Sequence, residues 1–131
     1  MIAVDTNVIV RLLLGDESTQ TAAARKVFDA GPVWISKTVL LEAGWVLRSV
    51  YGLSEVEVVT SFRLLLGLKN VEVEEPAVIG AALGLTEQGM DLADALHLSA
   101  RPVGAVFVTF DRAMGRVAGK AGLEGVEILR G

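Results

Sequence analysis

Four carboxylate residues are the strongest chemical signal in this sequence, and they are Asp5, Glu42, Asp94 and Asp111. Carboxylates bind divalent cations and transfer protons, so they can support hydrolysis with no other side chain involved. The chain contains no cysteine and a single histidine, His97, which excludes thiolate zinc sites, a cysteine nucleophile and multi-histidine metal sites. Any chemistry here must therefore depend on carboxylates, hydroxyls and bound ions.

Short apolar runs alternate with longer segments of helical spacing. The runs predict strands at Ile2–Val4, Val33–Ile35, Val71–Val73, Ala105–Thr109 and Val126–Leu129. The spacing predicts helices at Asn7–Leu14, Thr19–Ala30, Thr38–Tyr51, Ser54–Gly67, Pro76 to Gly89, Asp91 to the residue before Pro102, and Arg112–Lys120. Nearly all-apolar strands separated by helices predict a three-layer α/β/α fold with a mainly parallel central sheet. We expect one domain over residues 1–131.

The predicted strands and helices place the four carboxylates at one edge of that sheet. Asp5 and Asp111 follow predicted strands, Glu42 lies in the first half of a helix, and Asp94 lies in the first turn of another. Ligands of open parallel sheets bind at the carboxyl ends of the strands. Four carboxylates at this edge repel one another, and a divalent cation removes that penalty. Oxygen-only ligands favour Mg²⁺ or Mn²⁺ over zinc, and such a site indicates phosphoryl chemistry.

A structural role is the alternative at each of these positions. Asp5, Asp91 and Asp111 can serve as helix N-caps, and Asp94 can favour the helix dipole. Glu42 differs because no lysine or arginine lies within helical reach of it, so its alternative is a tertiary salt bridge.

Four blocks of sequence resemble the signatures of PIN domains, in the order that the family has them. They are Val4–Ile9, Thr38–Glu42, Asp91–Leu98 and Val108–Arg112. The resemblance spans essentially the whole chain and implies a divalent-metal-dependent endoribonuclease. It makes Asp5 and Asp94 the principal metal ligands, with Glu42 and Asp111 completing the acidic cluster. The positions that match residues orienting the carboxylates are Thr6, Asn7, Thr109 and Asp91.

A stand-alone PIN domain of this length resembles the VapC toxins, which pair with a small antitoxin and usually dimerise. We expect RNA as the substrate, with Lys37, Arg112 and Arg116 either contacting its phosphates or serving as ordinary solvated charges. For His97 we favour a structural, hydrogen-bonded role beneath the site over a catalytic one. The alternatives are a PIN module that binds without cutting, a nuclease of RNA maturation outside a toxin system, and a phospho-accepting receiver-like domain.

The net charge and the hydropathy of the chain exclude further classes of protein. The net charge of −4 excludes a protein that coats nucleic acid by bulk charge, although local contacts through a few arginines remain open. Charged residues interrupt every apolar run before the roughly 20 residues of a membrane span are reached. The first residues lack a basic segment and a long apolar stretch, so we expect a cytoplasmic protein without a signal peptide. Hydrophobic residues make up 52% of the chain, which favours a partner or dimer interface.

Overall fold

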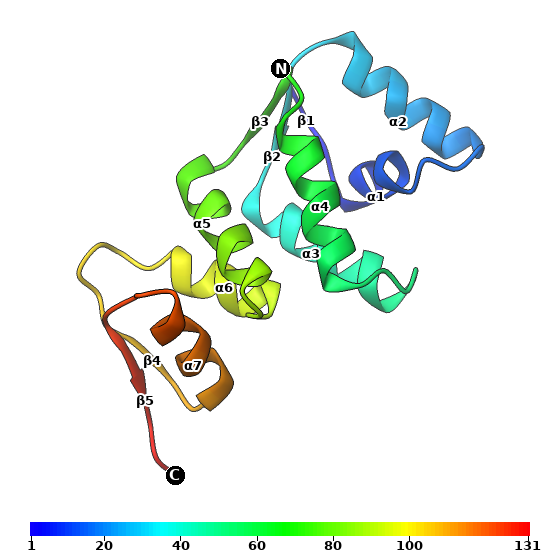
Figure 1. Ribbon diagram of the computed structural model, residues 1–131. Coiled ribbons are helices and arrows are strands. Elements are labelled where there is room, and N and C mark those ends of the chain that lie inside the picture. The colour runs from blue at the N-terminus through cyan, green and yellow to red at the C-terminus, as the bar shows by residue number, and fades with distance from the viewer. The chain divides into compact units, whose positions relative to one another are not determined.

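The computed structural model describes residues 1–131 and divides them into two compact units, Met1–Pro76 and Ala77–Gly131 (Figure 1). They are called unit 1 and unit 2. Each unit has its own parallel sheet and its own buried side chains. A single domain over residues 1–131 stays a prediction.

Unit 1 consists of a three-stranded sheet and four helices. Its elements are, in chain order, β1 (Ile2–Ala3), α1 (Thr6–Leu14), α2 (Thr19–Ala30), β2 (Val33–Ile35), α3 (Lys37–Ser49), α4 (Glu55–Leu66) and β3 (Val71–Val73). The strand order is β1-β2-β3 and both pairings are parallel. In the register, Ile2 lies opposite Val33, and Trp34 lies opposite Glu72. Parallel neighbours require long crossovers, which the helices supply.

The core of unit 1 lies among its helices. Helix α1 packs against α2 and α3, α3 packs against α4, and α4 packs against β3. The side chains of Ile9, Val10, Leu40, Leu47 and Phe62 are fully buried. Each such side chain contributes about 1.5–3 kcal/mol relative to exposure. This packing fixes α1 and α3, the two helices that carry the predicted site residues of the unit.

Unit 2 consists of α5 (Pro76–Glu87), α6 (Leu92–Ser99), β4 (Phe107–Thr109), α7 (Arg112–Lys120) and β5 (Val126–Ile128). Strand β4 pairs with β5 in parallel, and α7 is the crossover between them. Gly115 of α7 lies so close to Ile128 that an added Cβ would stand 2.5 Å from the Ile128 Cδ1 atom. Glycine at this position therefore lets α7 lie directly on β5.

Side chains that accept backbone N–H groups begin most of the helices. Ser18, Ser36 and Ser54 are the N-caps of α2, α3 and α4. Ser54 and Glu57 form a reciprocal capping box, as the sequence pattern predicts. An N-cap of this kind contributes about 0.5–2 kcal/mol.

The predicted α/β fold with parallel strands is confirmed, since every strand pairing is parallel. Four elements match the prediction residue for residue: α2, β2, β3 and α7. Strand β4 is shorter than predicted and begins at Phe107. The reason is that the carbonyl oxygen of Ala105 accepts a hydrogen bond from the Arg101 guanidinium, while its N–H donates to Pro102 in a turn. None of the helices combines the length and the apolar character needed to cross a membrane.

Candidate metal centre

Asp5 lies between β1 and α1, where its carboxylate serves as the helix N-cap. Its backbone is extended and its Oδ1 accepts the N–H of Val8 over 3.4 Å. This bond is long, and the residue is exposed. A carboxylate has about four lone-pair sites, so this capping role leaves Asp5 with oxygens free for a cation.

Glu42 is joined to the start of α1 by a hydrogen bond between distant segments. The Thr6 hydroxyl donates to the Glu42 carboxylate across 36 residues of sequence. Glu42 itself is exposed, although its helix buries Leu40 and Ala43 on the opposite side. The sequence left a tertiary salt bridge open as the alternative role of Glu42. Glu42 forms no salt bridge in the structure, so that alternative is wrong. Unit 1 therefore brings Thr6, the residue that follows Asp5, into contact with Glu42.

Asp94 is the half-buried carboxylate of unit 2. Burial raises its pKa above the usual value, and the charges of Asp91 and Asp111 raise it further, while His97 acts in the opposite direction. Asp91 is the N-cap of α6 and accepts the N–H groups of Ala93 and Asp94. Asp94 therefore combines partial burial with two like charges nearby, and both favour its neutral form.

Asp111 lies between β4 and α7, in the same relation to strand and helix as Asp5. Its Oδ1 accepts the N–H of Met114 over 3.1 Å, and its own N–H donates to the Thr109 hydroxyl over 3.0 Å. Thr109 thus orients the backbone that carries Asp111. Capping is confirmed as one role of Asp5, Asp91 and Asp111.

No group of three or more His, Cys, Asp or Glu side chains in the structure is arranged to hold a metal ion. In unit 1 Glu42 is bonded to Thr6, the neighbour of Asp5, and in unit 2 Asp94 interacts electrostatically with Asp91 and Asp111. One site formed by Asp5, Glu42, Asp94 and Asp111 stays a prediction.

The family model of the PIN domain matches residues 2–120 of the sequence. The chain belongs to the PIN domain family. The match includes every candidate site residue from Asp5 to Arg116, and it contradicts the receiver-like alternative.

This PIN domain is also similar to a solved structure, that of the Mycobacterium tuberculosis VapC20 toxin, described as cleaving the sarcin–ricin loop. The two chains are 19% identical, and the match covers 100% of this chain and 91% of the other with a TM-score of 0.45. That likeness is too distant to support an inference about activity. No curated protein matches the sequence.

The donor chemistry of the PIN domain fits a hard divalent cation. All of its candidate ligands are carboxylates, and their nearest polar neighbours, Thr6 and Thr109, are hydroxyls. Magnesium and manganese prefer oxygen ligands of this kind. A cation bound at Asp94 would offset both its burial and the like charges of Asp91 and Asp111.

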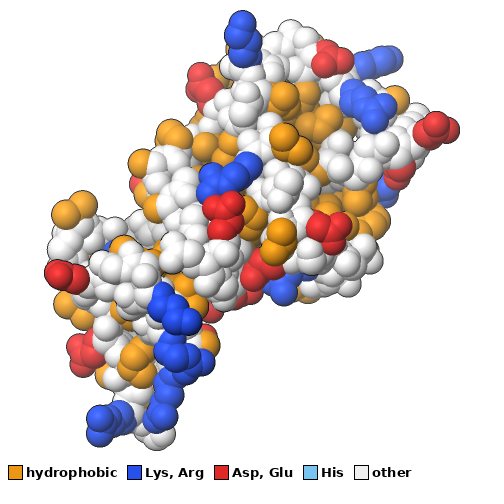
Figure 2. Space-filling model, in the orientation of Figure 1, with side chains coloured by type: hydrophobic (Ala, Val, Ile, Leu, Met, Phe, Trp, Pro, Cys, Tyr) orange, Lys and Arg blue, Asp and Glu red, His pale blue; other side chains and the backbone are white.

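The predicted cationic residues differ in their environments. Lys37 forms a 2.6 Å ion pair with Glu75, whose carboxylate raises the pKa of the lysine, so its charge is already neutralised. Arg112 and Arg116 are exposed on α7 and form no salt bridge. Figure 2 shows lysine and arginine side chains gathered over this part of unit 2. Sequence reasoning missed Lys120, although its spacing of four residues from Arg116 places it on the same helical face.

His97 and Asn7 do not form the hydrogen bonds expected of them in this structure, and their roles stay predictions. His97 is exposed and has no hydrogen bond, so the structural role predicted for it is not observed. Asn7 is exposed and forms no hydrogen bond to a carboxylate.

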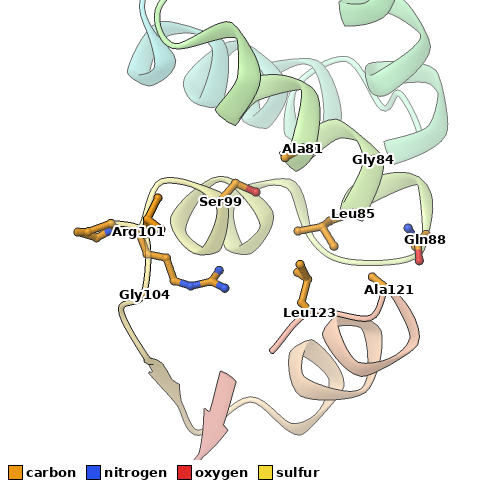
Figure 3. A pocket seen from close by; sticks show the side chains of 11 residues that line it. Ala81, Gly84, Leu85, Gln88, Ser99, Arg101, Gly104, Ala121 and Leu123 are labelled. Carbon is orange, nitrogen blue, oxygen red and sulfur yellow. The ribbon is translucent and has the colours of Figure 1, made fainter. Parts of the chain in front are cut away.

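A pocket in unit 2 lies apart from the carboxylates. It has a volume of about 480 Å³ and is lined by α5 and the segments that follow α6 and α7 (Figure 3). The Arg101 guanidinium at its wall donates to the carbonyl oxygens of Leu98, Ala105 and Glu124. These bonds hold the loop before β4, so we assign Arg101 a structural role.

Proposed function

We propose that this PIN domain is a divalent-metal-dependent endoribonuclease that hydrolyses RNA phosphodiester bonds. The observation that carries the proposal is the environment of Asp94, whose pKa is raised by burial and by the charges of Asp91 and Asp111. Accumulated carboxylate charge of this kind is typical of sites that hold a cation. Family membership and the oxygen-only donors support the same conclusion.

In this proposal Asp5, Glu42, Asp94 and Asp111 hold one or two Mg²⁺ or Mn²⁺ ions. The bound ion supplies a water of lowered pKa and stabilises charge on the phosphate. Two hydroxyls position the ligands: Thr6 holds the Glu42 carboxylate, and Thr109 holds the backbone of Asp111. Such supporting hydrogen bonds typically change metal affinity or activity by about 10–100-fold.

Asp91 has two effects in this scheme. It caps α6 and so fixes the helix that carries Asp94, and its charge favours a cation beside that residue. Arg112 and Arg116 contact the RNA phosphates. We leave Lys37 out because Glu75 already neutralises it.

We further propose that the protein is the toxin of a VapBC-type pair. The sequence resemblance to VapC toxins supports this assignment, which places the protein in the cytoplasm with a small antitoxin as its partner. Exposed apolar side chains on α4, Val56 at 74% and Leu64 at 71%, make this helix our candidate for a homodimer interface. Helix α1 exposes no large apolar side chain to this degree.

The test is cleavage of a mixed panel of structured and unstructured RNAs by the purified protein. Reactions contain Mg²⁺, Mn²⁺ or a chelator and include the Asp94→Asn variant. Asp29→Asn is the matched control, because Asp29 is an exposed residue of α2 outside the proposed site. We expect cleavage that requires metal, is lost in Asp94→Asn and is retained in Asp29→Asn.

Two results would contradict the proposal. Metal binding without cleavage across the panel favours the alternative of a PIN module that binds without cutting. Cleavage that persists in the chelator or in Asp94→Asn contradicts the assigned metal site. A neighbouring reading frame for a small DNA-binding protein distinguishes a toxin from a nuclease of RNA maturation.

A further inference from the structure

The start of helix α3 is held by side chains from a distant part of unit 1. The backbone N–H of Lys37, the first residue of α3, donates to Glu74 Oε1 over 3.0 Å. The side chain of Lys37 forms an ion pair with Glu75, with 2.6 Å between Nζ and Oε1. Glu74 and Glu75 directly follow strand β3. One residue of α3 is therefore bonded through its backbone and through its side chain to the segment after β3.

The bond to Glu74 satisfies a backbone group that the helix itself leaves without an acceptor. The first N–H groups of an α-helix have no partner within the helix, and negative charge is favourable beside them. Ser36 caps α3 by accepting the N–H of Val39, so the N–H of Lys37 requires another acceptor. The half-buried Glu74 supplies it from the end of the strand that pairs with β2. The bond therefore fixes where α3 begins relative to β3.

The backbone of Glu75 adopts a conformation that is uncommon for its residue type. Its φ angle is +44°, and it is the one residue other than glycine with a positive φ. A left-handed backbone is unfavourable for residues with a Cβ and persists where the surrounding contacts hold it. The ion pair with Lys37 is such a contact, and so is the bond from the Glu74 N–H to the carbonyl oxygen of Ile35. The turn after β3 is therefore held in a shape that brings two successive carboxylates to one residue of α3.

Glu42 lies on the same helix as this connection. It is five residues after Lys37, which is about one and a half helical turns along α3. Helix α3 is thus bonded to two other segments, to the start of α1 through Glu42 and Thr6 and to the end of β3 through Lys37. With its first residue fixed, α3 cannot slide along its axis or rotate without breaking these bonds. The position of the Glu42 carboxylate therefore depends on the contacts of Lys37.

We propose that Glu74 is a positioning residue for Glu42. Through the N–H of Lys37 it holds the first turn of α3 in the position where the Glu42 carboxylate meets the Thr6 hydroxyl. Glu75 supports this arrangement by binding the side chain of Lys37. When the Glu74 bond is lost, the first turn of α3 loosens and the Glu42 carboxylate is no longer held in place. The inference rests on the proposed function in taking Glu42 as a metal ligand, and it adds a residue that sets the geometry of that ligand.

Metal affinity is the first test. Mn²⁺ is titrated by calorimetry into the full-length protein and into Glu74→Ala, Glu74→Gln and Glu72→Ala. Glu72 is an exposed residue of β3, so its replacement is a matched loss of charge outside the connection. We expect the Kd of Mn²⁺ to rise by roughly 10-fold in Glu74→Ala and to stay near the wild-type value in Glu72→Ala. Glu74→Gln loses the charge but keeps an acceptor oxygen for the Lys37 N–H, so it should retain most of the affinity.

The geometry of Glu42 is measured directly in the second test, because a loss of stability alone does not establish a positioning role. The carbon-13 chemical shift of the Glu42 carboxyl is recorded by NMR in protein without metal. Thr6→Val removes the hydroxyl and gives the reference shift of a Glu42 without its hydrogen bond. In Glu74→Ala the shift should move toward this reference, whereas Glu74→Gln and Glu72→Ala should keep the wild-type shift. Urea unfolding verifies that each variant is folded, and Glu74→Asp, with its shorter reach, replaces Glu74→Ala if that variant does not fold.

The two measurements separate this inference from the proposed function. If the wild-type protein binds no Mn²⁺, the proposed metal site fails, and the carboxyl shift still decides whether Glu74 positions Glu42. An unchanged Glu42 shift in the folded Glu74 variant overturns the inference even if metal-dependent cleavage is found. An unchanged Kd in Glu74→Ala, when the wild type binds Mn²⁺, overturns it as well. Equal losses of affinity in Glu74→Ala, Glu74→Gln and Glu72→Ala assign the effect to net charge and also contradict a positioning role.

Discussion

The acidic residues of the two units differ in their burial and in their hydrogen bonds. In unit 1, Glu42 is exposed and accepts a hydroxyl hydrogen bond from Thr6. In unit 2, Asp94 is half-buried and lies near the carboxylates of Asp91 and Asp111, with no hydroxyl to stabilise its charge. Glu42 therefore has a hydrogen-bond donor within the protein, whereas Asp94 has its pKa raised by burial and by like charge.

Because of this difference, we expect the ligands of the proposed metal site to contribute unequally to metal binding. A cation that meets Asp94 relieves burial and repulsion together, so the electrostatic gain per ligand is largest there. Thr6 instead orients Glu42 whether or not an ion is bound. We therefore expect substitutions in unit 2 to affect metal binding most, and substitutions around Glu42 to have a graded effect.

The largest effect is expected for Asp94→Asn. The amide keeps the size of the side chain but removes its charge, so metal-dependent RNA cleavage should fall to the level seen in chelator. In the absence of metal, the variant should be at least as stable as the wild type, because the repelled charge is gone. Cleavage assays and urea unfolding in chelator measure the two effects, and a strongly destabilised variant would contradict our account of Asp94.

A smaller effect is expected for Thr6→Val, which removes the hydroxyl but keeps the shape of the side chain. Glu42 then loses its hydrogen bond, and cleavage should decrease by about 10–100-fold. Thr6→Ser keeps the hydroxyl and should retain most of the activity. Steady-state kinetics of both variants test this prediction, and equal rates in Thr6→Val and wild type would show that the bond has no functional role.

Metal binding should also appear as thermal stabilisation. An ion at about 100 times its Kd stabilises the native state by about 2.7 kcal/mol, which raises Tm by several degrees. The increase should be lost in Asp94→Asn and retained in Asp29→Asn. Differential scanning calorimetry with Mg²⁺ or Mn²⁺ against chelator measures the shift. A similar increase in Asp94→Asn would place the ion elsewhere.

The smallest effect concerns Asp16 of unit 1, a carboxylate whose pKa moves in the opposite direction to that of Asp94. Hydrogen bonds from Thr21 and then Ser18 lower the Asp16 pKa from 3.8 to about 2. Because the folded-state pKa lies below the unfolded value, this stabilisation is present above about pH 4 and is lost as the pH falls toward 2. Asp16→Asn should therefore be less stable than wild type at pH 5, and the difference should shrink near pH 2. Urea midpoints at the two pH values test it.

Local sequence was sufficient for the secondary structure and for the caps. The capping box of Ser54 and Glu57 and the N-cap roles of Asp5, Asp91 and Asp111 depend on residues two or three positions apart. Such interactions form within one helical turn, so the spacing of residue types is enough to predict them. The placement of each acid at a strand end or in the first half of a helix followed for the same reason.

The sequence by itself determined which acids lie at the ends of strands and at the starts of helices, because period and capping are local properties. Only the tertiary structure decided which of them have partners. The Thr6 bond to Glu42 and the Lys37 ion pair with Glu75 join residues 36 and 38 positions apart. No sequence spacing specifies such pairs, because they depend on which helix packs against which strand. The same packing half-buries Asp94 near two other carboxylates.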